Sequence, residues 1–141
     1  MESEAVAGVY SGPDRRKSKR IKAAFTVTYK LSKHIETEMW LEGREFSSIM
    51  IDLSADGMAI LTEKNIPKGA VLSISFTLNN EFNNQSRTMQ IEGEVRYNMP
   101  LRERSYRLGI VFTQVSDDDR FKIVEFVDMT MIWDPSYGLS T

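Results

Sequence analysis

The stretch that decides the fold is IMIDLSADGMAIL, residues 49–61. Every second residue from Ile49 to Leu53 is isoleucine or leucine, which is the pattern of a β-strand with one buried face. The Asp56-Gly57 pair favours a tight turn, and residues 58–61 then form a short return strand. The segment predicts a β-hairpin in which Asp52 and Ser54 lie on the face opposite the isoleucines.

The same alternation recurs elsewhere, so the chain is rich in short strands. Turn-forming residues separate the strands, at Pro67-Lys68-Gly69 and again in residues 100–104. The polar, asparagine-rich run of residues 79–86 is expected to be a surface loop. The other segments that read as strands are residues 24–31, 72–78, 89–97 and 106–112.

The periodicity changes near Ser116, where three aspartates follow the serine. Serine is a common helix N-cap, and carboxylates are favoured beside the free N–H groups of a first turn. Apolar residues then recur at helical spacing from Phe121 to Met131, and the Trp-Asp-Pro sequence at residues 133–135 ends the helix. Six short strands before one helix predict an all-β fold with a C-terminal helix. We expect a six-stranded antiparallel barrel, closed to protect its edges, with the helix packed on one end.

The composition excludes several classes of protein. With 141 residues, 41% hydrophobic and 27% charged, the chain is expected to be one domain with a substantial core. It has no cysteine and one histidine, His34, in a polar stretch between strands, which excludes thiolate or three-histidine metal sites. No apolar run reaches the roughly 20 residues that cross a bilayer, and the first residues do not resemble a secretory signal. We expect a cytoplasmic protein that is not an enzyme and has no metal or cofactor.

The charge is unevenly distributed. The chain carries a net charge of −2, yet six of the eight residues from 15 to 22 are basic. The other 133 residues hold 12 basic and 20 acidic side chains, a net charge of −8. One positive segment therefore accompanies an acidic body, which favours a small or local anion over an extended polyanion.

Two groups of residues together carry recognisable chemistry. Arg16 and Arg20 are four positions apart before the first predicted strand, and we expect both to be exposed and outside the strands. Asp52 and Ser54 share the outer face of the hairpin, and Gly57 permits the turn behind them. An arginine fork matches phosphate oxygens and the O6/N7 edge of guanine. A carboxylate accepts from the N1–H and N2–H₂ donors of the other guanine edge.

This combination resembles the PilZ domain family, bacterial receptors for cyclic di-GMP. The family pattern is RxxxR before the first strand and (D/N)xSxxG some tens of residues later. Arg16 and Arg20 match the first motif, and Asp52, Ser54 and Gly57 match the second without a departure. The sequence YRLGIVF at residues 106–112, before an acidic helix start, also resembles the family's last strand. The resemblance implies a PilZ domain over residues 13–133, with tails at residues 1–12 and 134–141.

The resemblance also implies a role for each motif residue. Arg16 and Arg20 would bind guanine and phosphate of cyclic di-GMP, and Asp52 would accept from a guanine edge. Ser54 would contact a phosphate or adjacent base, and Gly57 would hold the turn. We expect the basic arm to be free without ligand, because its like charges repel, and to be pinned to the barrel by the dianionic ligand. The protein would then be a receptor or adaptor that signals to an unidentified partner protein.

Arg15 bears on the number of ligands. In the family, a basic side chain immediately before the arginine motif accompanies capture of two intercalated cyclic di-GMP molecules. Arg15 occupies that position here. The resemblance therefore implies two ligand molecules per chain.

Three alternatives remain open on the sequence. A small barrel with a basic arm could bind RNA or single-stranded DNA, although the strand aromatics fall mostly on apolar faces. The fold could serve as an interaction module that binds no nucleotide. Asp52 and Ser54 could cap the hairpin turn while the arginines pair with surface carboxylates. Spacing does not decide whether other arginines lie near the site; those in question are Arg96, Arg102, Arg104 and Arg107.

Overall fold

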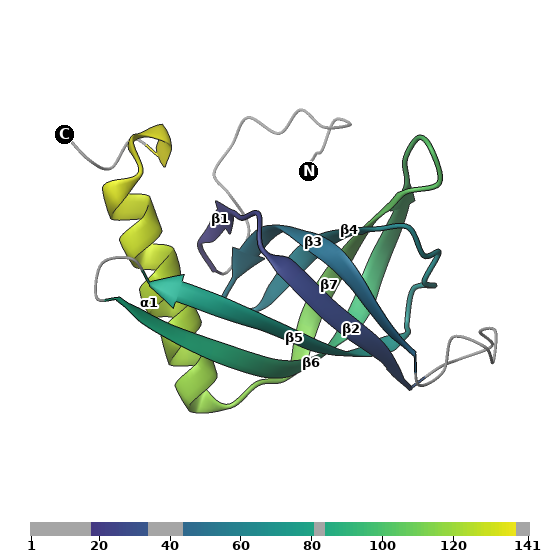
Figure 1. Cartoon of the computed structure of the whole chain (residues 1–141), viewed down its shortest axis with the longest axis horizontal. Helices are drawn as coiled ribbons and strands as arrows, with labels where there is room; N and C mark the ends of the chain where they lie inside the picture. Colours follow the sequence, from purple (N-terminus) through teal and green to yellow (C-terminus); the bar gives the residue numbers. More distant parts are fainter. Residues whose placement is uncertain (1–17, 34–43, 81–83, 138–141) are drawn as a thin grey trace, which may run out of the picture.

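Antiparallel strands and one long helix form most of the protein in the computed structural model, which describes residues 18–33, 44–80 and 84–137 (Figure 1). In chain order the elements are β1 (Arg20–Lys22), β2 (Thr26–Lys33), β3 (Glu45–Ser54), β4 (Gly57–Thr62), β5 (Val71–Asn80), β6 (Gln85–Pro100), β7 (Tyr106–Gln114), α1 (Asp117–Trp133) and the 3₁₀ turn η2 (Pro135–Tyr137).

Six of these strands close into the predicted barrel. The strand order is β3-β2-β5-β6-β7-β4, and β4 pairs again with β3, so every long strand has two neighbours. The short strand β1 is an addition that the sequence did not predict. It pairs with the last residues of β3, beyond the part that pairs with β2. Only three residues long, β1 offers no alternation that sequence analysis could detect.

The barrel interior is filled by alternate residues of the strands. On β5, Leu72, Ile74, Phe76 and Leu78 are all at most 4% exposed, as their period of two predicts. One polar contact lies inside: the Tyr29 hydroxyl and the Thr62 Oγ1 are 2.7 Å apart and buried. Burial raises the pKa of Tyr29 above its ordinary value, because the phenolate would be poorly solvated there.

Strand β3 contains a bulge that changes which side chains face inward. The β3–β4 register shifts between Met50 and Asp52, whose partners Ile60 and Ala59 are adjacent. The predicted common face of Ile49, Ile51 and Leu53 is therefore wrong: Met50 is buried, Ile49 is 50% exposed, and only after the bulge does Leu53 turn inward. An extra residue in one strand reverses the alternation, and here it leaves Asp52 on the outer face.

Helix α1 lies across one end of the barrel, beside the end of β5 and the start of β6 (Figure 1). The Ser116 Oγ accepts from the Asp119 N–H at 3.0 Å, which confirms the predicted N-cap. Ile123 and Val127 are buried, and the helix ends at Trp133 before Asp134 as predicted. Within the described residues, no helix is long and apolar enough to span a bilayer.

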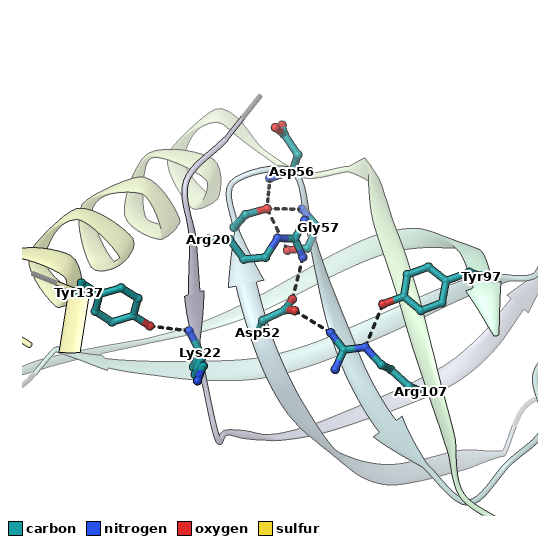
Figure 2. A network of polar contacts seen from close by, with 9 residues as sticks. Arg20, Lys22, Asp52, Asp56, Gly57, Tyr97, Arg107 and Tyr137 are labelled. Atoms are coloured by element: carbon teal, nitrogen blue, oxygen red, sulfur yellow. Dashed lines mark hydrogen bonds and ion pairs between the residues drawn. The ribbon is translucent and has the colours of Figure 1, made fainter. Parts of the chain in front are cut away.

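The C-terminal turn η2 returns to the start of the barrel. The Tyr137 hydroxyl accepts from the backbone N–H of Lys22 at 2.6 Å (Figure 2). Tyr137 also packs against the hydrophobic core. Strand β1 is therefore held on one side by β3 and touched on the other by the segment that follows α1.

Candidate functional site

Asp52 lies at the centre of a polar cluster on the outer face of the barrel. Its strand, β3, has β1 on one side and β4 on the other at this level. Arg20 is paired with Ser54, so its side chain reaches diagonally to Asp52 on the same face. The Arg20 Nη1 donates to the Asp52 Oδ1 at 2.7 Å (Figure 2). The side chains are 27% and 14% exposed respectively, so the pair is partly shielded from water.

A second arginine reaches the same carboxylate from β7. The Arg107 Nη2 donates to the Asp52 Oδ2 at 3.2 Å, and its Nε donates to the Tyr97 hydroxyl at 3.1 Å (Figure 2). The Tyr97 hydroxyl, and after it the Asp52 carboxylate, raise the pKa of Arg107 above its ordinary value. Both oxygens of Asp52 therefore accept from guanidinium groups, one from each side.

The charges in this cluster do not balance. One carboxylate accepts from two guanidinium groups, and Lys22, which is opposite Asp52 in the β1–β3 register, is a further basic residue of this strand pair. The Arg20 Nε is buried and has no hydrogen-bond partner. An unpaired cationic N–H in a positive cluster is suited to an anionic ligand that carries hydrogen-bond acceptors.

Small residues form the floor beside these side chains. Ala59 pairs with Asp52 on one side and with Gly109 on the other, and Ala59 is 1% exposed. A Cβ on Gly109 would lie 1.9 Å from the Tyr97 ring, so the ring covers this glycine closely. Tyr97 itself is 40% exposed. The outer face thus presents an aromatic side chain next to two arginines and a carboxylate.

The turn after β3 is held by Ser54. Its Oγ accepts from the N–H groups of Asp56 and Gly57, each at 3.2 Å, and donates to the Gly57 carbonyl at 3.3 Å. Gly57 packs directly on β7: a Cβ there would lie 2.2 Å from the Ile110 carbonyl oxygen. Serine and glycine are therefore required by the turn and by the close approach of β4 to β7.

Asp56 points away from Asp52, toward the helix and the chain before β1. Its carboxylate accepts from the Ser18 hydroxyl, and Arg120 of α1 donates to it at 2.8 Å. Arg120 also donates to the Ala55 carbonyl at 2.9 Å. The turn between β3 and β4 is therefore tied to α1 and to the residues that lead into β1.

The structure brings four of the six predicted site residues together: Arg20, Asp52, Ser54 and Gly57. Arg15 and Arg16 lie outside the described residues, as does His34. The expectation that Arg20 lies exposed outside the strands is wrong, since it belongs to β1 and pairs with Asp52. Residues 18–22 of the predicted arm lie against the barrel, through the β1–β3 ladder and the contact of Ser18 to Asp56. The reason is that acidic partners outweigh the mutual repulsion of the basic residues.

Two residues of the cluster were not assigned from the sequence. Spacing in the sequence does not place Arg107 near the motif residues, and it indicates only a strand position for Tyr97. Their proximity to Asp52 depends on the register across β3, β4, β7 and β6, which local patterns do not reveal. Arg96, by contrast, is a surface side chain whose Nε is 3.9 Å from Glu94.

The strand aromatics behave as their apolar faces predict. Tyr29, Phe76 and Phe112 are buried, while Phe25 and Tyr106 are partly buried and pack against the core. None of these five forms an outer platform for stacked bases. Among the described residues, no cluster of three or more metal-ligating side chains occurs.

Comparison with known proteins identifies the family of this domain. The model of the PilZ domain matches residues 14–129. The chain belongs to the PilZ domain family. No curated protein matches the sequence. The PilZ fold here is similar to several solved structures at low sequence identity, which establishes a shared fold.

Three of these structures illustrate the range of PilZ proteins. Bacillus subtilis MotI/DgrA, an inhibitor of motility, superposes with a TM-score of 0.70 at 16% identity over 84% of this chain and 52% of that one. The PilZ domain of Escherichia coli YcgR with c-di-GMP gives 0.56 at 17% identity, covering 82% and 91%. The K. pneumonia MrkH–c-di-GMP complex gives 0.58 at 18% identity, covering 84% and 52%. The chain thus spans about half the length of MotI/DgrA and MrkH.

Proposed function

We propose that this PilZ protein is a receptor for cyclic di-GMP, which it binds on the outer face of the barrel around Asp52. The observation that carries the proposal is the placement of Arg20 and Arg107 on the two oxygens of Asp52. Carboxylate, guanidinium groups and an exposed tyrosine supply what a guanine nucleotide needs: an acceptor for its N1–H and N2–H₂, donors for its phosphates, and a surface for its base.

Binding proceeds by exchange of donors on Asp52. Arg20 donates to one carboxylate oxygen of Asp52, which avoids the cost of a partly buried, unpaired charge. A guanine edge replaces that guanidinium with its own N–H donors, so Asp52 stays hydrogen-bonded throughout. Arg20 is then released to a phosphate or to the O6/N7 edge of a guanine. The buried, unpartnered Arg20 Nε gains an acceptor in the same step.

The motif residues divide into two functions. Arg20, Asp52 and the preceding Arg15 and Arg16 bind the ligand, with Arg15 supporting a second, intercalated molecule. Ser54 and Gly57 shape the turn that carries Asp52, and the hydroxyl of Ser54 is available to a phosphate only if its contacts to the turn loosen, because it is 1% exposed. Arg107 and Tyr97 add a cation and an aromatic ring to the residues that bind the ligand.

Signal output passes to a partner protein. Ser18 and Arg120 both contact Asp56. A shift of the residues before β1 would therefore change the contacts of the β3–β4 turn and of α1. The solved relatives are described as a motility inhibitor and as a c-di-GMP-dependent transcription regulatory factor, which supports a receptor function rather than catalysis.

Isothermal titration calorimetry tests the proposal. Wild-type protein should bind cyclic di-GMP and show no comparable binding of a single-stranded RNA. Arg16→Ala and Arg20→Ala should each lose most of the affinity, by about 1.5–3 kcal/mol for a charged, bidentate contact. Tight RNA binding without nucleotide binding would instead support the nucleic-acid alternative.

A further inference from the structure

Helix α1 has a second apolar face beside the one that packs on the core. Phe121, Val124 and Ile132 are 62%, 39% and 49% exposed, although each is large and hydrophobic. Together with Asp128 they follow helical spacing along one side of the helix, distinct from the side of the buried Ile123 and Val127. We call these four residues, Phe121, Val124, Asp128 and Ile132, the α1 stripe.

A basic side chain of the same protein already occupies part of the α1 stripe. The Lys19 Nζ lies 3.3 Å from the Asp128 Oδ1. Lys19 and Val124 line the same groove of about 260 Å³ between the helix and the chain before β1. An aliphatic stem beside a valine, with an ammonium group on a carboxylate, is the contact that a lysine of a partner helix would make.

The charges around the α1 stripe indicate the kind of partner. Asp117 and Asp118 are exposed at its N-terminal end, and Glu125 is paired with Lys122 at its side. Apart from residues 15–22, the whole chain carries a net charge of −8. A second copy of the chain would bring the same acids to this face, and an anionic membrane would be repelled by them.

We propose that the α1 stripe binds a basic amphipathic helix of a partner protein. Apolar side chains of that helix cover Phe121, Val124 and Ile132, and one of its lysines or arginines takes the place of Lys19 on Asp128. This is binding of a helix in a hydrophobic groove, with a charged pair setting the register. The surface does not overlap the cluster around Asp52, and its use does not require that the nucleotide be bound.

Two matched peptides test this on the full chain. Each is an amphipathic helix of about 18 residues with leucine on one face. One carries lysine on the other face, and the second carries glutamate at the same positions. Calorimetry and ¹⁵N NMR should show binding of the lysine peptide, with amide shifts concentrated in residues 121–132, and no binding of the glutamate peptide. Equal binding of both peptides, no binding of either, or shifts centred elsewhere would overturn the proposal.

Single substitutions then locate the site. Phe121→Ala and Asp128→Asn should each lower the affinity for the lysine peptide by about tenfold. This is the effect expected for an interface anchor or a paired charge. Glu45→Gln is the matched control, because it removes one exposed carboxylate at the start of β3, outside α1, and it should change affinity by less than about threefold. Lys19→Ala should tighten binding. Self-association lost in Phe121→Ala, or binding to anionic lipid vesicles, would assign the surface to another occupant and contradict the proposal.

Discussion

The guanidinium of Arg20 and the carboxylate of Asp52 lie 2.7 Å apart across the β1–β3 ladder, although 32 residues separate them in the chain. They belong to the two motifs that are characteristic of the PilZ family, so a residue of one motif is hydrogen-bonded to a residue of the other. Under the proposed function, cyclic di-GMP has to displace this ion pair, and it would supply guanine donors for Asp52 and acceptors for Arg20.

Arg107 lies outside both sequence motifs, and its contact to Asp52 leads to a separate prediction. Arg107→Ala should weaken cyclic di-GMP binding by about tenfold, since a hydrogen bond to a charged group is worth about 1.5–3 kcal/mol. Arg96→Ala is the matched control: Arg96 is on the neighbouring strand and 3.9 Å from Glu94, with no contact to Asp52. Calorimetry measures the affinity of both variants for cyclic di-GMP. Equal affinities would show that Arg107 does not contact the ligand.

Two glycines should respond differently to the same substitution. In Gly57→Ala the new Cβ meets the Ile110 carbonyl oxygen at 2.2 Å, and backbone cannot move aside cheaply. We expect a loss of at least about 2 kcal/mol in the free energy of unfolding. In Gly109→Ala the obstacle is the Tyr97 ring, which is 40% exposed and can swing outward. Here stability should fall by about 1 kcal/mol or less, while ligand affinity falls because Tyr97 leaves Arg107.

Urea unfolding and ligand titration of both glycine variants test this contrast. The prediction fails if Gly109→Ala is the less stable protein, or if it binds cyclic di-GMP as well as wild type does.

Tyr29 makes stability depend on alkaline pH. Burial raises its pKa in the folded state above the ordinary value near 10. Above that ordinary value the unfolded chain loses the proton while the folded protein keeps it, so the free energy of unfolding falls as pH rises toward the raised pKa. Tyr29→Phe should cost about 1 kcal/mol at neutral pH, through the lost contact to Thr62, and reduce the alkaline loss. Unfolding curves between about pH 8 and 11 measure how the free energy of unfolding depends on pH. If this dependence is as steep in Tyr29→Phe as in wild type, Tyr29 is not its cause.

Arg15 should determine ligand stoichiometry. Two intercalated cyclic di-GMP molecules bring about four negative charges, and an additional guanidinium can neutralise phosphate and stack on a base. We expect two ligands per chain for wild type and one for Arg15→Leu. The measurement is a titration at protein concentrations far above the dissociation constant. One ligand bound by the wild type would refute the role of Arg15.

Much of the fold was predictable because its signals are local. Strict alternation on β5 and the serine cap with three aspartates on α1 each depend on neighbours in sequence. The bulge at Met50–Asp52 was not predictable, since a single inserted residue leaves the hydrophobic composition unchanged and only moves Ile49 outward. Strand β1 is too short to show a period.

The candidate site also has a part with a local sequence signal and a part without one. Asp52, Ser54 and Gly57 lie within six residues, so a short local motif that resembles the family pattern was enough to predict them. Arg107 and Tyr97 reach the site through three strand pairings, so only the assembled barrel reveals them. The ion pair between Arg20 and Asp52 depends equally on a strand that no local pattern indicated.

The central claim is that Asp52 receives the nucleotide. The most direct measurement compares calorimetric titrations of cyclic di-GMP into wild type, Asp52→Ala and Asp56→Ala, with thermal melts to confirm that each variant is folded. Asp56 is the matched control: it is an acid four residues away whose carboxylate contacts Ser18 and Arg120. The account predicts binding by wild type, a loss of about tenfold or more in Asp52→Ala, and a smaller loss in Asp56→Ala. No binding by wild type, or equal losses in the two variants, would contradict it.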